Sequence, residues 1–101
     1  MITSEQAREI ADRFIAEANA RPRYGDDELV ITGFAEHRFG WSFSYQSSRW
    51  VETGDIQHLL IGQGPVVIDR RDGSVHAFGS ATPDADVARF QERYDAETKN
   101  L

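Results

Sequence analysis

The stretch GWSFSYQSSRWVETGD, residues 40–55, changes its pattern halfway along. In the first half Trp41, Phe43 and Tyr45 alternate with polar residues, and this period of two predicts a strand over residues 41–47. The three rings would share one face of that strand, so we expect them at the centre of the core. The second half lacks strand periodicity, which predicts an irregular connection.

Capping residues and apolar periodicity predict the elements around this strand. Thr3 and Gln6 have the spacing of a helix capping box, and an apolar stripe at helical spacing follows them. Asp72-Gly73 is typical of a hairpin turn, and Thr82-Pro83 is typical of a helix start. The expected elements are a helix over residues 4–20, strands over residues 29–38, 66–69 and 74–79, and a helix that begins at Pro83.

This order of elements predicts the fold class. Strands that follow one another between two terminal helices are typical of an α+β protein with an antiparallel sheet. We expect four to five strands, with the N-terminal and the C-terminal helix packed on one face of the sheet. The chain of 101 residues is short enough that we expect a single domain over residues 1–101.

The amino-acid composition favours some classes of binding partner over others and favours one cellular compartment. The chain has 17 acidic against 11 basic Lys and Arg residues, a formal net charge of -6, which disfavours nucleic-acid binding and favours a basic partner. It has no apolar run near the ~20 residues of a membrane span, and no basic and apolar leader segment at its start. It has no cysteine, which fits a reducing compartment, so we expect a cytoplasmic protein with no membrane association.

No catalytic or cofactor pattern stands out. The three histidines, His37, His58 and His76, show no metal-ligand spacing with another histidine or a carboxylate. The serines of residues 42–48 lack the surroundings of a nucleophile elbow, and the turn at residues 62–65 lacks the lysine and helix of a phosphate-binding loop. We therefore expect no enzymatic activity, no cofactor and no metal.

Some side chains in residues 26–55 allow two interpretations. Trp50 beside Arg49 could anchor an interface, or Trp50 could fold back and cap the core. Glu52 and Asp55 could form an acid/base pair, but Thr53-Gly54-Asp55 is also a typical turn. Asp26 and Asp27 could meet a basic partner or lie in a solvated loop.

Taken together, these segments resemble the bacterial immunity protein 35 family. The resemblance rests on a Gly-Trp pair followed by alternating aromatics, then Glu-Thr-Gly-Asp, then Gly-x-Gly-Pro with a β-branched strand, then Asp-Gly-x-Val. A Gly-Ser pair before the last helix and an Ala-x-x-Ile-Ala motif in the first helix complete it. The matching positions are Ala7, Ile10, Ala11, Gly40, Trp41, Phe43, Tyr45, Glu52, Thr53, Gly54, Asp55, Gly62, Gly64, Pro65, Asp69, Asp72, Gly73, Val75, Gly79 and Ser80.

The resemblance implies a small cytoplasmic α+β protein, often encoded near toxin genes, that binds and neutralises a cognate toxin domain. It implies no enzymatic activity and no cofactor. A free-standing protein-binding or chaperone-like module of the same fold is the alternative, and a small enzyme is a third. The expected partner-binding residues are Arg49, Trp50, Glu52, Asp55, Asp26 and Asp27, and an exposed strand edge would favour a homodimer.

Overall fold

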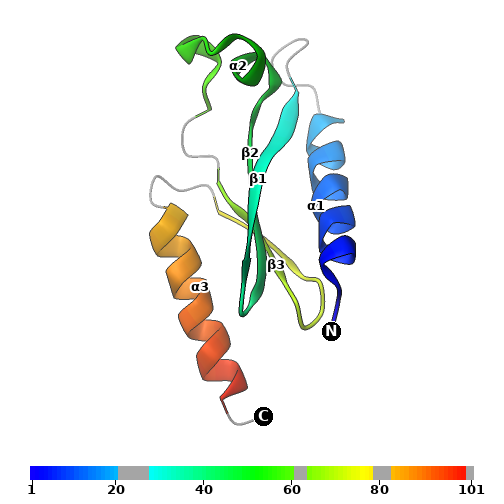
Figure 1. The fold of residues 1–101 in the computed structure, drawn as a ribbon, viewed down its shortest axis with the longest axis vertical. Coiled ribbons are helices and arrows are strands. Elements are labelled where there is room, and N and C mark those ends of the chain that lie inside the picture. Colours follow the sequence, from blue (N-terminus) through cyan, green and yellow to red (C-terminus); the bar gives the residue numbers. More distant parts are fainter. Residues whose placement is uncertain (21–27, 61–63, 79–82, 100–101) are drawn as a thin grey trace.

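The computed structural model describes residues 1–20, 28–60, 64–78 and 83–99 (Figure 1). Its elements are α1 (Ser4–Asn19), β1 (Leu29–His37), β2 (Gly40–Ser47), α2 (Ser48–Thr53), the 3₁₀ helix η1 (Ile56–His58), β3 (Val66–Asp69), β4 (Val75–Ala77) and α3 (Pro83–Thr98). The four strands form an antiparallel sheet in chain order, β1-β2-β3-β4. The predicted α+β class and the antiparallel sheet between terminal helices are confirmed.

Strand β2 organises the sheet because it pairs with a neighbour on each side. It pairs with β1 along its whole length, but with β3 only from Gly40 to Phe43. Gly40 has a φ of 146°, and a Cβ atom there would lie 2.0 Å from the carbonyl oxygen of Ile68, so only glycine allows this close approach. Beyond Phe43 the β1–β2 hairpin continues past β3 and carries α2 at its far end, in a molecule of 48 × 25 × 19 Å (Figure 1).

The two terminal helices cover opposite faces of the sheet, so the expectation that both pack on one face is wrong (Figure 1). In β3, Val66 and Ile68 pack in a cluster with α1, whereas Val67 packs in a second cluster with α3. Successive side chains of a strand point to opposite faces, so three consecutive apolar residues need cover on both sides.

The first cluster confirms the predicted aromatic core. Trp41, Phe43 and Tyr45 are buried against Ala7 and Ala11 of α1. The small alanine side chains allow α1 to lie close to the sheet. The predicted capping box also forms, because Thr3 and Gln6 each accept a hydrogen bond from the other's backbone N–H.

The second cluster is centred on Phe39, which sequence patterns placed only in a turn. Phe39 is fully buried, and its ring lies 4.9 Å from that of Phe90 on α3 and 4.6 Å from that of His37. His76 and Phe78 share a face, and both rings contact Phe90.

An ionic network ties the β3–β4 hairpin to α3. Arg71 donates hydrogen bonds from its guanidinium to buried Asp69 and to Glu97, and it lies 4.7 Å from the ring centre of Tyr94. Burial alone would raise the pKa of Asp69, but the hydrogen bonds and charge of Arg71 outweigh it, so this pKa lies below its ordinary value of 3.8.

Two predicted features lie partly outside the described residues: the turn at residues 62–65, of which Gly62 and Gln63 are not described, and the helix start at Thr82-Pro83, of which Thr82 is not described. Within the described residues, α1 ends at Asn19, β1 at His37 and β4 at Ala77, each one or two residues before the predicted end. None of the helices in this part of the chain is long and apolar enough to cross a membrane.

Candidate partner-binding surface

The segment predicted to be irregular is a short helix followed by a 3₁₀ turn, so that prediction is wrong. The Ser47 hydroxyl accepts a hydrogen bond from the Trp50 N–H, which caps the start of α2. Gly54 ends α2 in the left-handed conformation, with φ of 70°, and donates its N–H to the Trp50 carbonyl. Asp55 then caps η1 by accepting the Gln57 N–H. The six residues of α2 make fewer than two helical turns, too few to show periodicity, so only these caps could have indicated the helix.

We call α2 and η1, residues 48–58, the tip, because they lie at the far end of the β1–β2 hairpin (Figure 1). Four predicted binding residues come together here. Arg49 and Trp50 are half-buried, whereas Glu52 and Asp55 are exposed. Trp50 belongs to neither core cluster of the described residues. Asp26 and Asp27 lie outside the described residues.

The tip also exposes two apolar side chains that the sequence analysis missed. Val51 is 52% exposed and Ile56 is 77% exposed. Each neighbours a predicted acidic residue in the sequence, Glu52 and Asp55 respectively. Both side chains are β-branched and lie in a segment without strand periodicity. This combination is the sequence feature that could have indicated their exposure.

Side-chain hydrogen bonds fasten the tip to the sheet. The Gln46 amide donates to the Leu60 carbonyl at 2.9 Å and accepts the Leu60 N–H at 3.0 Å. Ser48 donates its N–H to the Glu28 carbonyl, and its hydroxyl accepts the Glu28 N–H. Both ends of the tip are therefore held, so its exposed side chains are presented on an ordered backbone.

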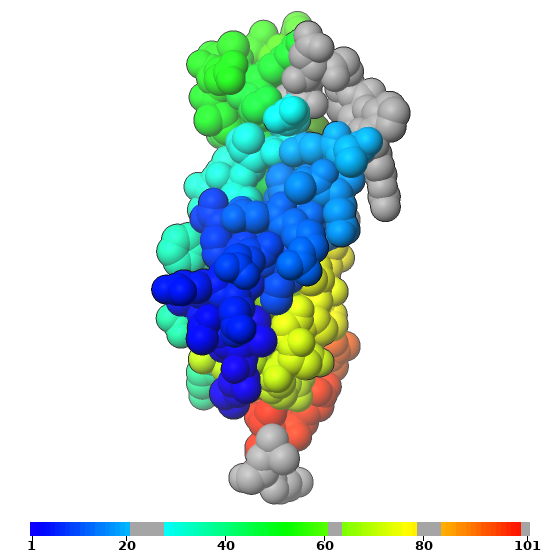
Figure 2. All heavy atoms as spheres, turned by 90° about the vertical axis from the view of Figure 1, so that its right-hand side faces the viewer, coloured from blue at the N-terminus to red at the C-terminus, as the bar shows by residue number. Residues whose placement is uncertain are grey.

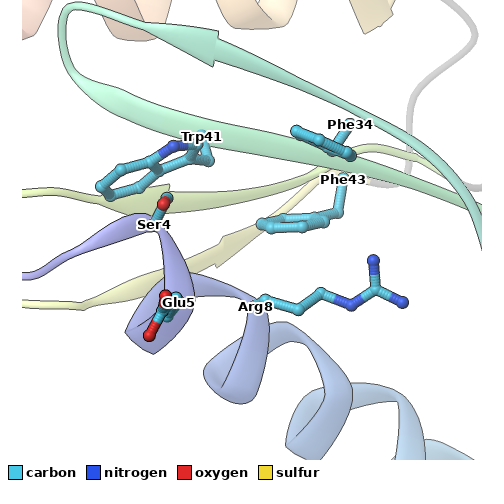
Figure 3. Close-up of a pocket in the computed structure, with 6 residues that line it drawn as sticks. All are labelled: Ser4, Glu5, Arg8, Phe34, Trp41 and Phe43. Carbon is cyan, nitrogen blue, oxygen red and sulfur yellow. The ribbon is translucent and has the colours of Figure 1, made fainter.

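A second surface feature is a hollow between the start of α1 and the β1–β2 hairpin (Figure 3). It measures about 210 Å³, and its lining residues are Ser4, Glu5, Arg8, Phe34, Trp41 and Phe43. The Phe34 ring is 68% exposed and stacks on Phe43 with ring centres 6.0 Å apart. The sequence analysis missed this feature.

A shift in register places Phe34 in the hollow. Ile31 pairs with Tyr45, but Gly33 pairs with Ser44 and Phe34 with Phe43, so Thr32 is an extra residue in β1. Without this bulge, strict alternation from Ile31 would point Phe34 to the other face of the sheet. Bulges are not readable from apolar alternation alone.

Outside the tip and the hollow, many polar side chains are hydrogen-bonded or ion-paired to another side chain. His37 Nε2 lies 2.8 Å from the Ser42 hydroxyl, and burial lowers the pKa of His37. His76 Nε2 lies 3.0 Å from the Ser74 hydroxyl. Among the described residues, no group of three or more His, Cys, Asp or Glu side chains is arranged to hold a metal ion.

Comparison with known proteins gives two matches. The model of the immunity protein 35 family matches residues 5–97. The uncharacterized protein YrhB of Escherichia coli (strain K12) is 32% identical over 83 residues, which cover 82% of this chain and 81% of YrhB. No solved structure matches the chain. The family match extends over nearly all of α1 and α3 and over all four strands of the described sheet, so this chain belongs to the immunity protein 35 family.

Proposed function

We propose that this chain is an immunity protein that binds a cognate bacterial toxin domain in the cytoplasm and neutralises it by occlusion, without catalysis. Membership of the immunity protein 35 family supports the immunity role. The observation that carries the binding surface is the tip, where Val51 and Ile56 are exposed beside Glu52 and Asp55 on a capped backbone.

The chemistry of the tip suits a basic toxin face. Apolar side chains at the centre of an interface exclude water, and charges around them provide orientation and specificity. Val51 and Ile56 would supply the apolar centre, while Glu52 and Asp55 would pair with lysine or arginine on the toxin. The net charge of -6 would also speed the approach of a basic partner, in a way that salt weakens.

The arrangement of the histidines supports a role without catalysis. A general base needs a free imidazole nitrogen or carboxylate directed at a substrate-sized cleft. His37 and His76 each lie within hydrogen-bond distance of a serine hydroxyl; the His37 ring stacks on Phe39, and the His76 ring meets Phe90 at an angle of 57°. These contacts pack both imidazole rings against phenylalanine and occupy the Nε2 atom of each, as is typical of structural histidines.

The first test is a pull-down from the native host with this chain as bait, at low and at high salt. We expect one stoichiometric partner with a toxin-type domain, held less firmly at high salt. A scatter of unfolded client proteins, or no partner, would contradict the immunity role and favour a free-standing binding or chaperone-like module.

The second test locates the surface by charge reversal. The variant Glu52→Lys/Asp55→Lys should bind the captured toxin at least tenfold more weakly, because two interface charges become repulsive. The matched control is Glu9→Lys/Glu17→Lys, which makes the same charge change at two exposed positions of α1. Equal losses in the two variants would show that only net charge matters and would contradict binding through the tip.

A further inference from the structure

The free edge of β1 is unusually open to pairing. Within the described residues β1 pairs only with β2. On its other side the Asn19 amide takes both backbone groups of Leu29, and the later residues of β1 remain for pairing with a further strand. Natural edge strands are often protected by lysine, proline or a covering segment. The sequence of β1, LVITGFAEH, contains no lysine, arginine or proline. Its only interruption is the bulge at Thr32, after which Gly33–His37 pair regularly with β2.

Phe34 adds an apolar contact to this edge. Its ring is 68% exposed and lies on the α1 face, stacked on Phe43 beside the hollow (Figure 3). Figure 2 shows the β1 residues, in cyan to green, along one flank of α1, with the β3–β4 residues in yellow on the other. A strand that paired with β1 would therefore bring its own side chains directly against Phe34.

Two ion pairs offset charge on this flank, and the exposed Glu5 beside the hollow is a carboxylate outside them. Arg8 pairs with Asp12 at 3.0 Å on α1, and Arg70 pairs with Glu36 at 3.2 Å at the end of β1. This differs from the tip, where two acidic side chains are exposed. An acidic protein can approach a copy of itself closely only where its surface charges are already compensated.

We propose that β1 is the dimer interface of this protein, paired antiparallel with β1 of a second copy about a two-fold axis normal to the sheet near Phe34. The two four-stranded sheets then become one continuous sheet, and the two Phe34 rings lie side by side on the same face. The two copies of α1 run antiparallel on that face. Arg8 and Asp12, which pair within each copy at 3.0 Å, would then also be able to pair across the two-fold axis, which would make the contact self-complementary.

The dimer leaves the tip free. The tip lies at the end of the β1–β2 hairpin where β1 begins, and Phe34 lies in the second half of β1 (Figure 1). The two-fold axis would place the two tips at opposite ends of the assembly. Each dimer could then hold two toxin domains.

The test is sedimentation equilibrium over a dilution series. The wild type should sediment at twice the 11.4 kDa mass of the chain, and Phe34→Glu should sediment as a monomer because two carboxylates would face each other. The matched control is Val75→Glu, the same type of change at an exposed position on the opposite edge strand β4, and it should remain dimeric.

A charge swap provides a second route that does not depend on Phe34. Arg8→Asp should weaken the dimer at least tenfold, and Arg8→Asp/Asp12→Arg should restore it, with far-ultraviolet circular dichroism showing that each variant is folded. A monomeric wild type, or a Phe34→Glu dimer as stable as the wild type, would overturn the proposal. Failure of the charge swap to restore the dimer would overturn it as well.

Discussion

Gln46 and Leu60 are joined by a pair of hydrogen bonds in which one side-chain amide satisfies both backbone groups of the other residue. The same arrangement joins Asn19 to Leu29, whose backbone N–H and C=O both bond to the Asn19 amide. Each amide replaces a strand partner at a point where the chain enters or leaves the sheet. Removing such a clamp destabilises the protein, because two partly buried backbone groups are then left without a hydrogen-bond partner.

We therefore predict that Gln46→Leu lowers the free energy of unfolding by about 1–3 kcal/mol, the usual cost of unsatisfied buried polar groups. Urea unfolding gives this value, and hydrogen exchange should show faster exchange at the Leu60 amide. Ser44→Ala is the control, since Ser44 is exposed on the same strand. Equal losses of stability in the two variants would mean that the clamp contributes nothing.

Gly40→Ala should destabilise the protein severely, by more than about 3 kcal/mol, because the new Cβ atom would collide with the backbone of β3. Gly33→Ala is the matched control in β1. A Cβ atom there meets nothing within 4 Å and φ is not positive, so we expect stability to stay level or rise. Thermal melting of the two variants measures the difference, and similar melting temperatures would contradict the close approach of β2 and β3.

Phe39→Ala should lower the free energy of unfolding by about 3–5 kcal/mol, since it removes a fully buried ring from between the sheet and α3. Ile56→Ala, at an exposed apolar position of the tip, should change it by less than about 0.5 kcal/mol. Calorimetry gives both values. A small effect at Phe39 would mean that α3 does not depend on this ring for its packing.

The ion pair between Asp69 and Arg71 should make the free energy of unfolding depend on pH in the acidic range. Because the pKa of Asp69 is lower in the folded protein than in the unfolded chain, its contribution is fully present above about pH 4. It is lost as the pH falls through the folded pKa, since the unfolded chain takes up the proton first. Asp69→Asn should cost about 1.5–3 kcal/mol at pH 7, and its deficit relative to the wild type should shrink in acid.

Unfolding by urea at a series of pH values measures this dependence. The control, Glu92→Gln on α3, neutralises an exposed carboxylate, and we expect little change at any pH. A deficit for Asp69→Asn that stays constant between pH 7 and pH 2 would contradict the role of the charged pair.

The tip was found from the sequence in outline only. Its clustering of Arg49, Trp50, Glu52 and Asp55 is a consequence of their nearness along the chain, so composition alone could indicate it. The helix of the tip was missed because its six residues, fewer than two turns, are too few to show a helical period. The exposure of Val51 and Ile56 depends on which side of that turn meets the sheet, which local sequence does not encode.

The environments of Phe34 and Phe39 were also beyond what local sequence patterns could predict. Alternation from Ile31 places Phe34 on the wrong face, because the bulge at Thr32 reverses the phase of β1. Phe39 follows a polar pair in a tight turn, and it is buried only because α3 comes back over that turn from a position some fifty residues later.

Local features of the sequence determined the two terminal helices, the strands, the β3–β4 hairpin turn and the family, because caps, alternation and glycine positions act between residues close in the chain. Only the tertiary structure decided that α1 and α3 lie on opposite faces, that Thr32 is a bulge, and that no described strand or helix covers the second half of β1 or the tip. These features depend on which distant surfaces pack together. A run such as Val66-Val67-Ile68 requires cover on both faces but does not specify which helix supplies it.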